Sequence, residues 1–426
     1  MATFGIAMLA FVVLLFIGMP IAISIGMTTA FALFLSDIPV SFIAQLSFSA
    51  LDSFTYLAIP MFIMAGFVME TGGLSRRIVN FASSLVGRTA GGLGIVTVVA
   101  CMFFAAISGS SPATVAAIGS MMVPSMIEKG YNRHFAGALT ASAGSLGILI
   151  PPSIPMIIYA VTAEISIGDM FLAGFIPGAM IGTGLILVVY WISKRRGYKG
   201  KDEDFSLQQV KTTLKEAKWA LLTPIIILGG IYSGIFTATE AACITVIYTL
   251  IISLFFHKEM KFSDLRPVIV KAALTTGCVI IILGFATAFA RYLTISQIPQ
   301  MIGELILSYT NNATLILMIF VVLIMFTGLF IETAAQILIY TPLFLPILVQ
   351  LGVSPYHFGI ILIVGTELGL ITPPVGVNLF VAKGITGSSM VQLSRAIVPF
   401  LLSMLLVQFS LVLLPEVITF LPNLFG

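Results

Sequence analysis

The stretch Leu-Gly-Ile-Leu-Ile-Pro-Pro at 146–152 decides the fold, because it places two consecutive prolines inside a long apolar run. Proline lacks the backbone N–H donor and clashes with the preceding helical turn, so the pair must interrupt a helix. A second copy, Leu-Gly-Leu-Ile-Thr-Pro-Pro, occurs at 368–374 in the other half of the chain. The two copies predict two membrane segments that are each broken into half-helices.

The composition of the whole chain is that of a membrane protein. Of its 426 residues, 59% are hydrophobic and only 9% are charged, whereas an ordinary soluble domain carries about 25% charged residues. Disordered proteins, coiled coils, secreted disulfide scaffolds and nucleic-acid-binding proteins are therefore excluded. The sequence predicts an all-α polytopic membrane protein surrounded by a lipid bilayer.

The apolar segments give a topology when they are combined with the positions of the basic residues. A crossing needs about 20 apolar residues, and Lys and Arg concentrate in cytoplasmic loops. The apolar stretches 94–127 and 313–350 are each long enough to enter and leave the membrane. Ten further segments are predicted to cross the membrane fully: 3–17, 19–36, 56–73, 136–163, 172–193, 220–236, 238–256, 272–291, 358–384 and 397–418. The first of them, 3–17, is predicted to be a membrane span and not a cleaved signal peptide.

The two long apolar stretches are predicted to be re-entrant hairpins that open to opposite sides. Basic residues flank 94–127 on both sides, so this hairpin opens to the cytoplasm and has its tip near Ser108–Pro112. No Lys or Arg occurs between Tyr292 and His357, so the hairpin at 313–350 opens outward. The polar segment 194–218 is predicted to be a cytoplasmic linker.

Five crossings precede this linker and five follow it, so the second half starts from the opposite face of the membrane. This arithmetic predicts an inverted repeat of residues 1–193 and 219–426 with both termini in the periplasm, a plan common among secondary transporters. The shift in numbering that carries Leu146 onto Leu368, which we call the repeat offset, also superposes Pro124 on Pro346 and Gly130 on Gly352.

Four interruptions mark the candidate site: the hairpin tips at 108–112 and 328–333, and the breaks at 143–153 and 365–374. Irregular backbone persists in a membrane only where it is buried in protein or lines a wet cavity. Carbonyls freed before a break can bind a small cation such as Na⁺, and the N-terminus of the next half-helix favours an anion. The alternative is that Gly and Ser at kinks serve close helix packing.

Acidic side chains at these interruptions have two possible roles. Glu332 and Glu367 are the acids predicted deep in the second half, where either could hold a cation or relay a proton. Alternatively, Glu332 caps a helix and Glu367 satisfies amides near its break. Glu240 follows Thr237 with the spacing of a capping box, which predicts a structural role.

Other polar residues also remain open. Arg291 near the outer boundary could bind a substrate carboxylate, or it could extend to the membrane interface or pair with Glu304. Asn378, after the second Pro-Pro pair, could donate to a polar ligand or tie down the broken helix. His357 flanks a loop and is expected at the surface. A serine hydrolase based on Ser110 or Ser111 would need a His or Lys inside the bilayer, and none is predicted there, so the protein is not expected to be an enzyme.

With these motifs in hand, the chain resembles the DctM-like large membrane subunit of tripartite ATP-independent periplasmic (TRAP) transporters over essentially its whole length. The resemblance is carried by five motifs: GMPIAISIG (18–26), SGSSPAT (108–114), GILIPPS (147–153), GGIYSGIFTATEAA (229–242) and GLITPPVGVNLF (369–380).

The resemblance implies a Na⁺-coupled importer of an organic acid across the bacterial inner membrane. It also implies two partners, a periplasmic substrate-binding protein and a separate small four-helix (DctQ-like) membrane subunit. The expected motion is an elevator in which residues 75–163 and 292–384 move against a scaffold. The alternative is a stand-alone Na⁺/dicarboxylate symporter that needs no binding protein.

The resemblance also carries residue roles onto this chain. It implies no organic cofactor and no transition metal, with Na⁺ as the coupling ion. Which acid is carried (a C4-dicarboxylate, a sugar acid or sialic acid) stays open. The implied Na⁺ residues are Gly109, Ser110, Gly144, Ser145, Gly328, Glu332, Thr366, Gly369 and Thr372. The residues expected at the substrate are Ser111, Ser153, Thr333, Asn378 and Arg291.

Overall fold

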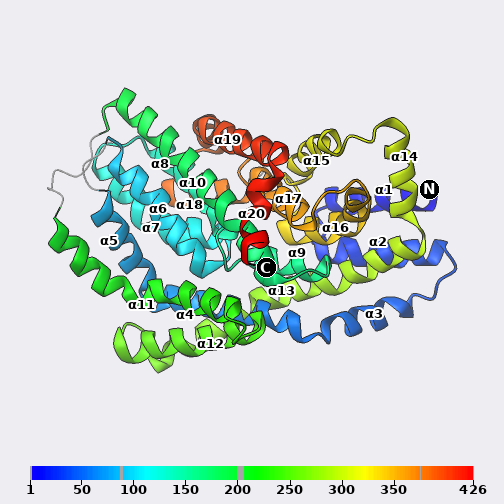
Figure 1. Cartoon of the computed structure of the whole chain (residues 1–426), viewed down its shortest axis with the longest axis horizontal. Helices are drawn as coiled ribbons and strands as arrows, with labels where there is room; N and C mark the ends of the chain where they lie inside the picture. The colour runs from blue at the N-terminus through cyan, green and yellow to red at the C-terminus, as the bar shows by residue number, and fades with distance from the viewer. Residues whose placement is uncertain (1, 87–89, 199–205, 375, 426) are drawn as a thin grey trace.

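The computed structural model describes residues 2–86, 90–198, 206–374 and 376–425, and every regular element within these ranges is a helix (Figure 1). The first half of the chain forms α1 (Ala2–Phe16), α2 (Ile21–Leu35), α3 (Ser41–Leu51), η1 (Phe54–Leu57), α4 (Ala58–Thr71), α5 (Leu74–Leu85), α6 (Gly92–Ser108), α7 (Ser111–Glu128), α8 (Arg133–Gly144), η2 (Ser145–Ile148), α9 (Ile154–Thr162) and α10 (Ile167–Arg196). The second half forms α11 (Leu207–Tyr232), α12 (Ala238–Ile251), η3 (Ile252–Phe256), α13 (Phe262–Ile295), α14 (Ile298–Tyr309), α15 (Ala313–Thr327), α16 (Thr333–Gln350), α17 (Pro355–Leu370), α18 (Val377–Thr386), α19 (Met390–Leu413) and α20 (Pro415–Phe425).

The helices pack as two groups. In the scaffold bundle (α1–α4 and α11–α13), α13 packs against α2, α3 and α4, and α12 packs against α4. In the hairpin bundle (α6–α10 and α15–α20), α10 packs against α6 and α19, and α19 packs against α8. In Figure 1, α3 and α12 of the scaffold bundle lie along the lower edge, and α8 and α19 of the hairpin bundle lie near the upper edge. They meet where α13 contacts α16 and α4 contacts α6, while α5 and α14 touch both groups.

This packing differs from the expected division of the chain. The crossings at 172–193 and 397–418 were expected in the scaffold, but α10 and α19 pack against the hairpins and the broken helices. Hydropathy cannot assign such helices to a neighbour, because lipid-facing and protein-facing surfaces are both apolar.

Each expected hairpin consists of two helices joined by a tight turn. Helix α6 ends at Ser108, and α7 begins at Ser111. Gly109 between them has φ +57°, a left-handed conformation that favours glycine. In the second hairpin, residues 328–332 join α15 to α16.

Both Pro-Pro pairs interrupt a helix, as proline chemistry predicts. Helix α8 continues into η2, and an irregular segment at 149–153 then leads to α9. Helix α17 ends at Leu370, and α18 begins at Val377. The peptide bonds Pro151–Pro152 and Pro373–Pro374 are both cis.

The helix bounds repeat with the offset found in the sequence. The repeat offset carries α7 (111–128) onto α16 (333–350), and it carries α8 with η2 (133–148) onto α17 (355–370). The packing repeats as well, because α7 contacts α18 and α16 contacts α9. The opposite orientation of the two halves in the membrane stays a prediction.

The all-α polytopic fold is confirmed. The described residues contain six helices long and apolar enough to cross a membrane, or seven if the bent pair α14–α15 counts as one span. Three short helices were not expected from hydropathy, namely α3, α5 and α14, because none exceeds 12 residues.

Two predicted segments show further detail. The predicted linker at 194–218 is partly helical, because α10 continues to Arg196 and α11 begins at Leu207; residues 199–205 lie outside the described residues, and the cytoplasmic position of the linker stays a prediction. The crossing expected at 397–418 is interrupted between α19 and α20 at Leu414. A residue that precedes a proline, here Pro415, disfavours the helical conformation.

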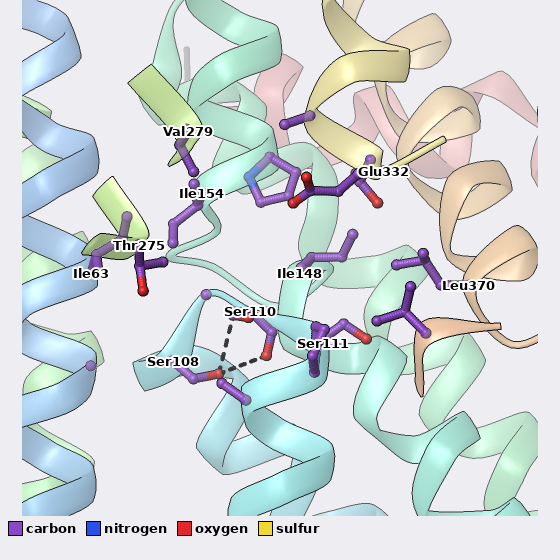
Figure 2. A pocket seen from close by; sticks show the side chains of 18 of the residues that line it. Ile63, Ser108, Ser110, Ser111, Ile148, Ile154, Thr275, Val279, Glu332 and Leu370 are labelled. Carbon is purple, nitrogen blue, oxygen red and sulfur yellow. Dashed lines mark hydrogen bonds between the residues drawn. The ribbon is translucent and has the colours of Figure 1, made fainter. Parts of the chain in front are cut away.

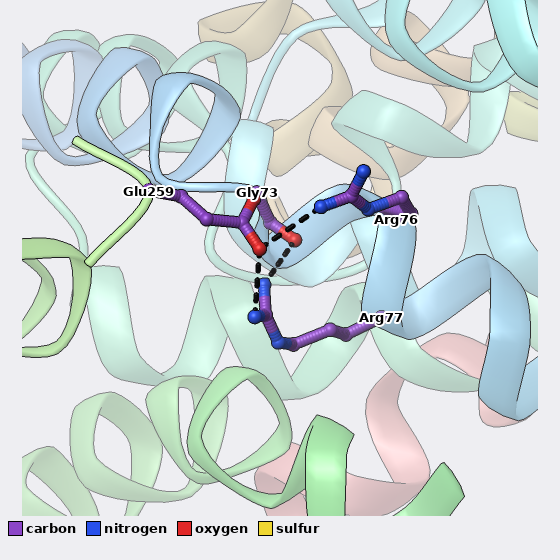
Figure 3. A network of polar contacts seen from close by, with 4 residues as sticks. All are labelled: Gly73, Arg76, Arg77 and Glu259. Carbon is purple, nitrogen blue, oxygen red and sulfur yellow. Dashed lines mark hydrogen bonds and ion pairs between the residues drawn. The ribbon is translucent and has the colours of Figure 1, made fainter. Parts of the chain in front are cut away.

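An ion-pair network fixes the start of α5 to the loop between η3 and α13 (Figure 3). The Glu259 carboxylate accepts from the guanidinium groups of Arg76 at 2.9 Å and Arg77 at 2.7 Å. Arg77 also donates to the carbonyl of Gly73 at 3.0 Å. Gly73 has φ +71°, and a Cβ atom there would collide with Glu259, so the network requires glycine at this position.

We expect Glu259→Gln to lower the free energy of unfolding by about 1 kcal/mol or less, since solvent screens this partly exposed network. Partial burial raises the pKa of Glu259, but the hydrogen bonds and charges of Arg77 and Arg76 outweigh it and hold the pKa below its ordinary value. The stabilisation is therefore present at neutral pH and lost as the pH falls through the lowered pKa. Thermal unfolding at about pH 7 and about pH 3 measures it; an equal difference between the two proteins at both pH values would contradict the prediction.

Candidate functional site

A cavity of about 360 Å³ lies between the two bundles (Figure 2). The scaffold side is formed by α4, through residues such as Ile63 and Glu70, and by Thr275 and Val279 of α13. The opposite side is formed by both hairpin tips and both broken helices. All four interruptions found in the sequence thus converge on one space, although they come from the two separate halves of the chain.

Four helix N-termini contribute residues to the wall of this cavity. Its lining includes the first residues of α7 (Ser111), α9 (Ile154), α16 (Thr333) and α18 (Val377). The first N–H groups of a helix have no partner within the helix, and the helix dipole places partial positive charge at this end. Four such ends around one cavity favour a negatively charged ligand.

Helix C-termini with their free carbonyls reach the same cavity. Ser108 and Gly109 at the end of α6, Ile148 at the end of η2 and Leu370 at the end of α17 contribute to its lining. Partial negative charge at these ends favours a cation. The cavity therefore combines elements suited to an anion with elements suited to small cations, as in transporters that use broken helices.

Hydrogen bonds hold the first hairpin tip in its shape. The hydroxyl groups of Ser108 and Thr114 lie 2.8 Å apart, and Thr114 Oγ1 donates to the carbonyl of Ser110 at 2.8 Å. Figure 2 shows Ser108, Ser110 and Ser111 on one side of the cavity and Glu332 on another. The tip thus has a fixed backbone on which the carbonyl groups are oriented in advance.

Glycines allow each tip to touch the break of its own half. A Cβ atom on Gly147 would lie 2.6 Å from the carbonyl oxygen of Ser110, and one on Gly369 would lie 2.6 Å from the Cα atom of Gly328. Real Cβ atoms do not approach other atoms so closely. The repeat offset relates Gly147 to Gly369 but not their partners, since Ser110 corresponds to Glu332 and Gly328 to Ala106, so each half joins its tip to its break through a different backbone contact.

Carboxylates are the charged groups of the cavity. Glu70, Glu332 and Glu367 line it, and none of the described lining residues is Lys, Arg or His. Glu332 occupies the N-cap position of α16, but its side chain forms no capping hydrogen bond and is exposed to the cavity. The geometry therefore does not favour a capping role for the Glu332 side chain.

The residues expected to bind Na⁺ separate into two sets. Gly109, Ser110 and Glu332 line the cavity. The others are not among the cavity-lining residues. The Thr366 hydroxyl donates to the Ile363 carbonyl within α17, and the Thr372 hydroxyl, beyond the end of α17, donates to the Leu368 carbonyl. The members of this second set are Gly144, Ser145, Gly328, Thr366, Gly369 and Thr372.

The residues expected at the substrate also separate. Ser111 and Thr333 line the cavity. Ser153 is buried and caps α9 by accepting from the Met156 N–H at 3.3 Å. Asn378 is fully buried and donates to Ser111 Oγ at 2.6 Å. Arg291 lies exposed on α13 and is not part of the cavity lining.

Sequence reasoning missed the scaffold side of the cavity. Glu70 and Thr275 lie within or next to predicted crossings, and an acid inside an apolar segment was the signal that could have singled out Glu70. Nothing in the local sequence distinguishes Thr275 from a threonine in an ordinary helix.

We expect Arg291→Ala to leave the apparent affinity for substrate within about twofold of the wild-type value, because its side chain does not face the cavity. Concentration-dependent uptake into proteoliposomes measures this. A tenfold weaker apparent affinity, rescued by Arg291→Lys, would instead assign this charge to the substrate.

Comparison with known proteins gives a consistent set of relatives. The family model for the DctM component of the tripartite ATP-independent periplasmic transporter matches residues 8–417. The chain is 44% identical to the isethionate TRAP transporter permease protein DctMQ of Oleidesulfovibrio alaskensis, over 93% of this chain and 63% of that protein. It is 41% identical to the C4-dicarboxylate TRAP transporter large permease protein DctM of Pseudomonas aeruginosa (89% and 88% covered) and 35% identical to the sialic acid TRAP transporter large permease protein SiaM of Vibrio cholerae (97% and 96% covered).

Among solved structures, the fold is similar to that of the Alcanivorax borkumensis YdaH transporter. The TM-score is 0.66 over 88% of this chain and 87% of that one, at 15% sequence identity. A likeness at this identity concerns the arrangement of helices alone.

Proposed function

This chain belongs to the DctM component family of TRAP transporters, and from this we propose that it imports an organic anion together with Na⁺. Its relatives are transport permeases and not enzymes, and the chain is a multi-pass protein of the inner membrane.

The observation that carries the proposal is the charge pattern of the cavity. Four helix N-termini attract an anion, while three glutamates among the described lining residues repel it and no basic side chain of that lining compensates. An organic anion therefore binds favourably only when cations enter with it and neutralise the carboxylates. This requirement couples the two solutes, since neither binds well alone.

The two contacts between tip and break are the proposed Na⁺ sites. One uses the backbone and hydroxyl oxygens of Gly109, Ser110, Gly144 and Ser145. The other uses Gly328, Glu332, Thr366, Gly369 and Thr372. The close approach of Ser110 to Gly147 and of Gly328 to Gly369 supports this assignment, because it brings carbonyls from separate segments together.

The proposed substrate contacts are the polar groups at the helix N-termini. Ser111 and Thr333 line the cavity and supply hydroxyl groups beside the free N–H groups of α7 and α16. Two buried residues support this surface. Ser153 caps α9, and Asn378 donates a hydrogen bond to Ser111.

The proposed motion is an elevator movement of the hairpin bundle along the scaffold bundle. The cavity lies at the boundary between the two, so a displacement of one bundle carries the tips, the breaks and a bound ligand together. Helices α10 and α19 belong to the moving group in this proposal because they pack against it.

Relatives named for isethionate, C4-dicarboxylate and sialic acid transport suggest an organic acid for this chain as well. Membership of the TRAP family further suggests a periplasmic substrate-binding protein and a separate small membrane subunit as partners. Five crossings on each side of a cytoplasmic linker place both termini in the periplasm in this proposal.

Uptake into proteoliposomes tests the proposal. The chain is reconstituted with its small subunit, the binding protein is added outside, and these three acids are supplied with and without an inward Na⁺ gradient. Uptake of at least one acid that requires both the gradient and the binding protein supports the proposal. Uptake that ignores the Na⁺ gradient overturns it, and uptake without any binding protein favours a stand-alone Na⁺/dicarboxylate symporter.

A further inference from the structure

Glu70 is the charged residue that the scaffold bundle contributes to the described lining of the cavity. Four residues of α4 line the cavity at helical spacing and so form one stripe along the helix: Ile63, Gly66, Phe67 and Glu70. Glu332 and Glu367, in contrast, belong to the hairpin bundle. Glu70 therefore stays with the scaffold when the proposed elevator movement carries the other two carboxylates away.

The scaffold wall of the cavity becomes more exposed toward one end. Along the α4 stripe, Ile63 is only 4% exposed, whereas Glu70 near the end of the helix is exposed. On α13, Val279 is half-buried and Thr275, one turn nearer the start of that helix, is exposed. The ion-pair network of Glu259 joins these two ends, because it ties the start of α5 to the loop before α13. The cavity therefore opens at the end that Glu70 and Thr275 share.

This open end faces the cytoplasm in the proposed topology. Arg76 and Arg77 follow α4 within a few residues, and Lys258 and Lys261 precede α13. Lys and Arg concentrate on the cytoplasmic side of membrane proteins. This conformation of the chain is therefore open to the cytoplasm, and Glu70 lies on the side by which a substrate anion would leave.

The fold itself gains nothing from a carboxylate at Glu70. The residue lies in the last turn of α4, where the helix dipole places partial negative charge and disfavours an acid. Its side chain forms no ion pair and no hydrogen bond with any other described residue. The charge therefore acts on the cavity and on the solute that the cavity holds.

From these observations we propose that Glu70 promotes release of the substrate anion to the cytoplasm by charge repulsion. This role rests on the proposed function and extends it to the step of release. The four helix N-termini move with the hairpin bundle and attract the anion in both positions of the elevator, whereas Glu70 faces it only where the cavity opens to the cytoplasm. A fixed charge of this kind lowers the affinity for the anion on one side of the membrane.

Exchange of acid across proteoliposomes tests this role. The chain is reconstituted with its small subunit, and binding protein added outside selects the chains whose periplasmic face points outward. Na⁺ is saturating and equal on both sides. The vesicles contain unlabelled acid at a series of concentrations, and the initial rate of entry of the same radiolabelled acid is followed, with succinate, isethionate and sialic acid as the probes. The quantity compared is the internal concentration that produces half of the effect on this rate.

We expect Glu70→Gln to lower this internal concentration roughly fivefold, which is the effect of two unit charges about 4 Å apart in water. Glu70→Asp keeps the charge and should behave as the wild type does. Glu128→Gln is the matched control, because Glu128 is also an exposed acid in the last turn of a helix, α7, but does not line the cavity. The external concentration of acid for half-maximal entry should stay the same in all these proteins.

Three results would overturn the inference while leaving the proposed function intact. In the first, Glu70→Gln has the same internal concentration as the wild type and Glu128→Gln. In the second, its external concentration falls as much as the internal one, which would make Glu70 part of a site used on both sides. In the third, the wild-type rate does not respond to internal acid at all. Uptake by the wild type that ignores a Na⁺ gradient would instead overturn the proposed function, and the inference with it.

Discussion

Replacing Gly369 by alanine is expected to abolish most Na⁺-dependent uptake while the protein stays folded and inserted. The new Cβ atom would lie 2.6 Å from Gly328 Cα and 2.8 Å from its carbonyl carbon, and backbone atoms cannot rotate away as a side chain can. The second hairpin tip must therefore separate from its break. Overpacking of this kind costs about 1–3 kcal/mol, which corresponds to roughly a tenfold or greater loss of Na⁺ affinity if the cost falls on the bound state.

The Na⁺ concentration for half-maximal uptake measures this effect. Gly384→Ala is the matched control, because Gly384 lies in α18 after the same break and a Cβ atom there meets nothing within 4 Å. Gly147→Ala should reproduce the defect in the first half, since its Cβ atom would meet the Ser110 carbonyl. If Gly369→Ala showed the Na⁺ dependence of the control, the contact between tip and break would have no role in ion binding.

The Glu332→Gln substitution is expected to produce the other large effect, a loss of ion-coupled transport without a loss of stability. Its side chain forms no capping bond and faces the cavity, so the amide replaces the carboxylate without breaking a contact within the fold. Interactions with a charged group are worth about 1.5–3 kcal/mol. Roughly a ten- to hundredfold weaker response to Na⁺ follows from that value.

Initial rates of uptake across a series of Na⁺ concentrations separate the possible roles of Glu332. A shift in the Na⁺ requirement with an unchanged maximal rate supports a cation ligand. A loss of substrate affinity at saturating Na⁺ would move Glu332 to the substrate side of the cavity. Wild-type behaviour in both measurements would remove Glu332 from the site, and Glu304→Gln controls for the change in net charge.

Local chemistry explains why several elements could be predicted from the sequence. The stretches 94–127 and 313–350 do contain two helices each, and both Pro-Pro pairs do interrupt helices. The capping box at Thr237 and Glu240 is also present, with the Glu240 carboxylate accepting from the Thr237 N–H at 2.8 Å. Each of these features depends on residues within a few positions of one another.

Features that depend on distant neighbours could not be predicted in this way. His357 was expected at a surface, but it is buried and its Nε2 lies 2.9 Å from the Leu411 carbonyl oxygen. Arg291 has the charge that suits an organic acid, yet it lies outside the cavity lining. The burial of a side chain at the end of a helix is set by which other helix packs over it.

The amino-acid sequence alone therefore determined where the membrane helices are interrupted and that the interruptions recur at one constant offset, because proline and glycine act on the backbone next to them. Only the tertiary structure decided which interruptions share one cavity, that Glu70 and Thr275 of the scaffold complete it, and that Asn378 reaches Ser111. The physical reason is that helices in a membrane are apolar on the faces that meet lipid and on those that meet protein. Hydropathy therefore carries little information about which helices become neighbours.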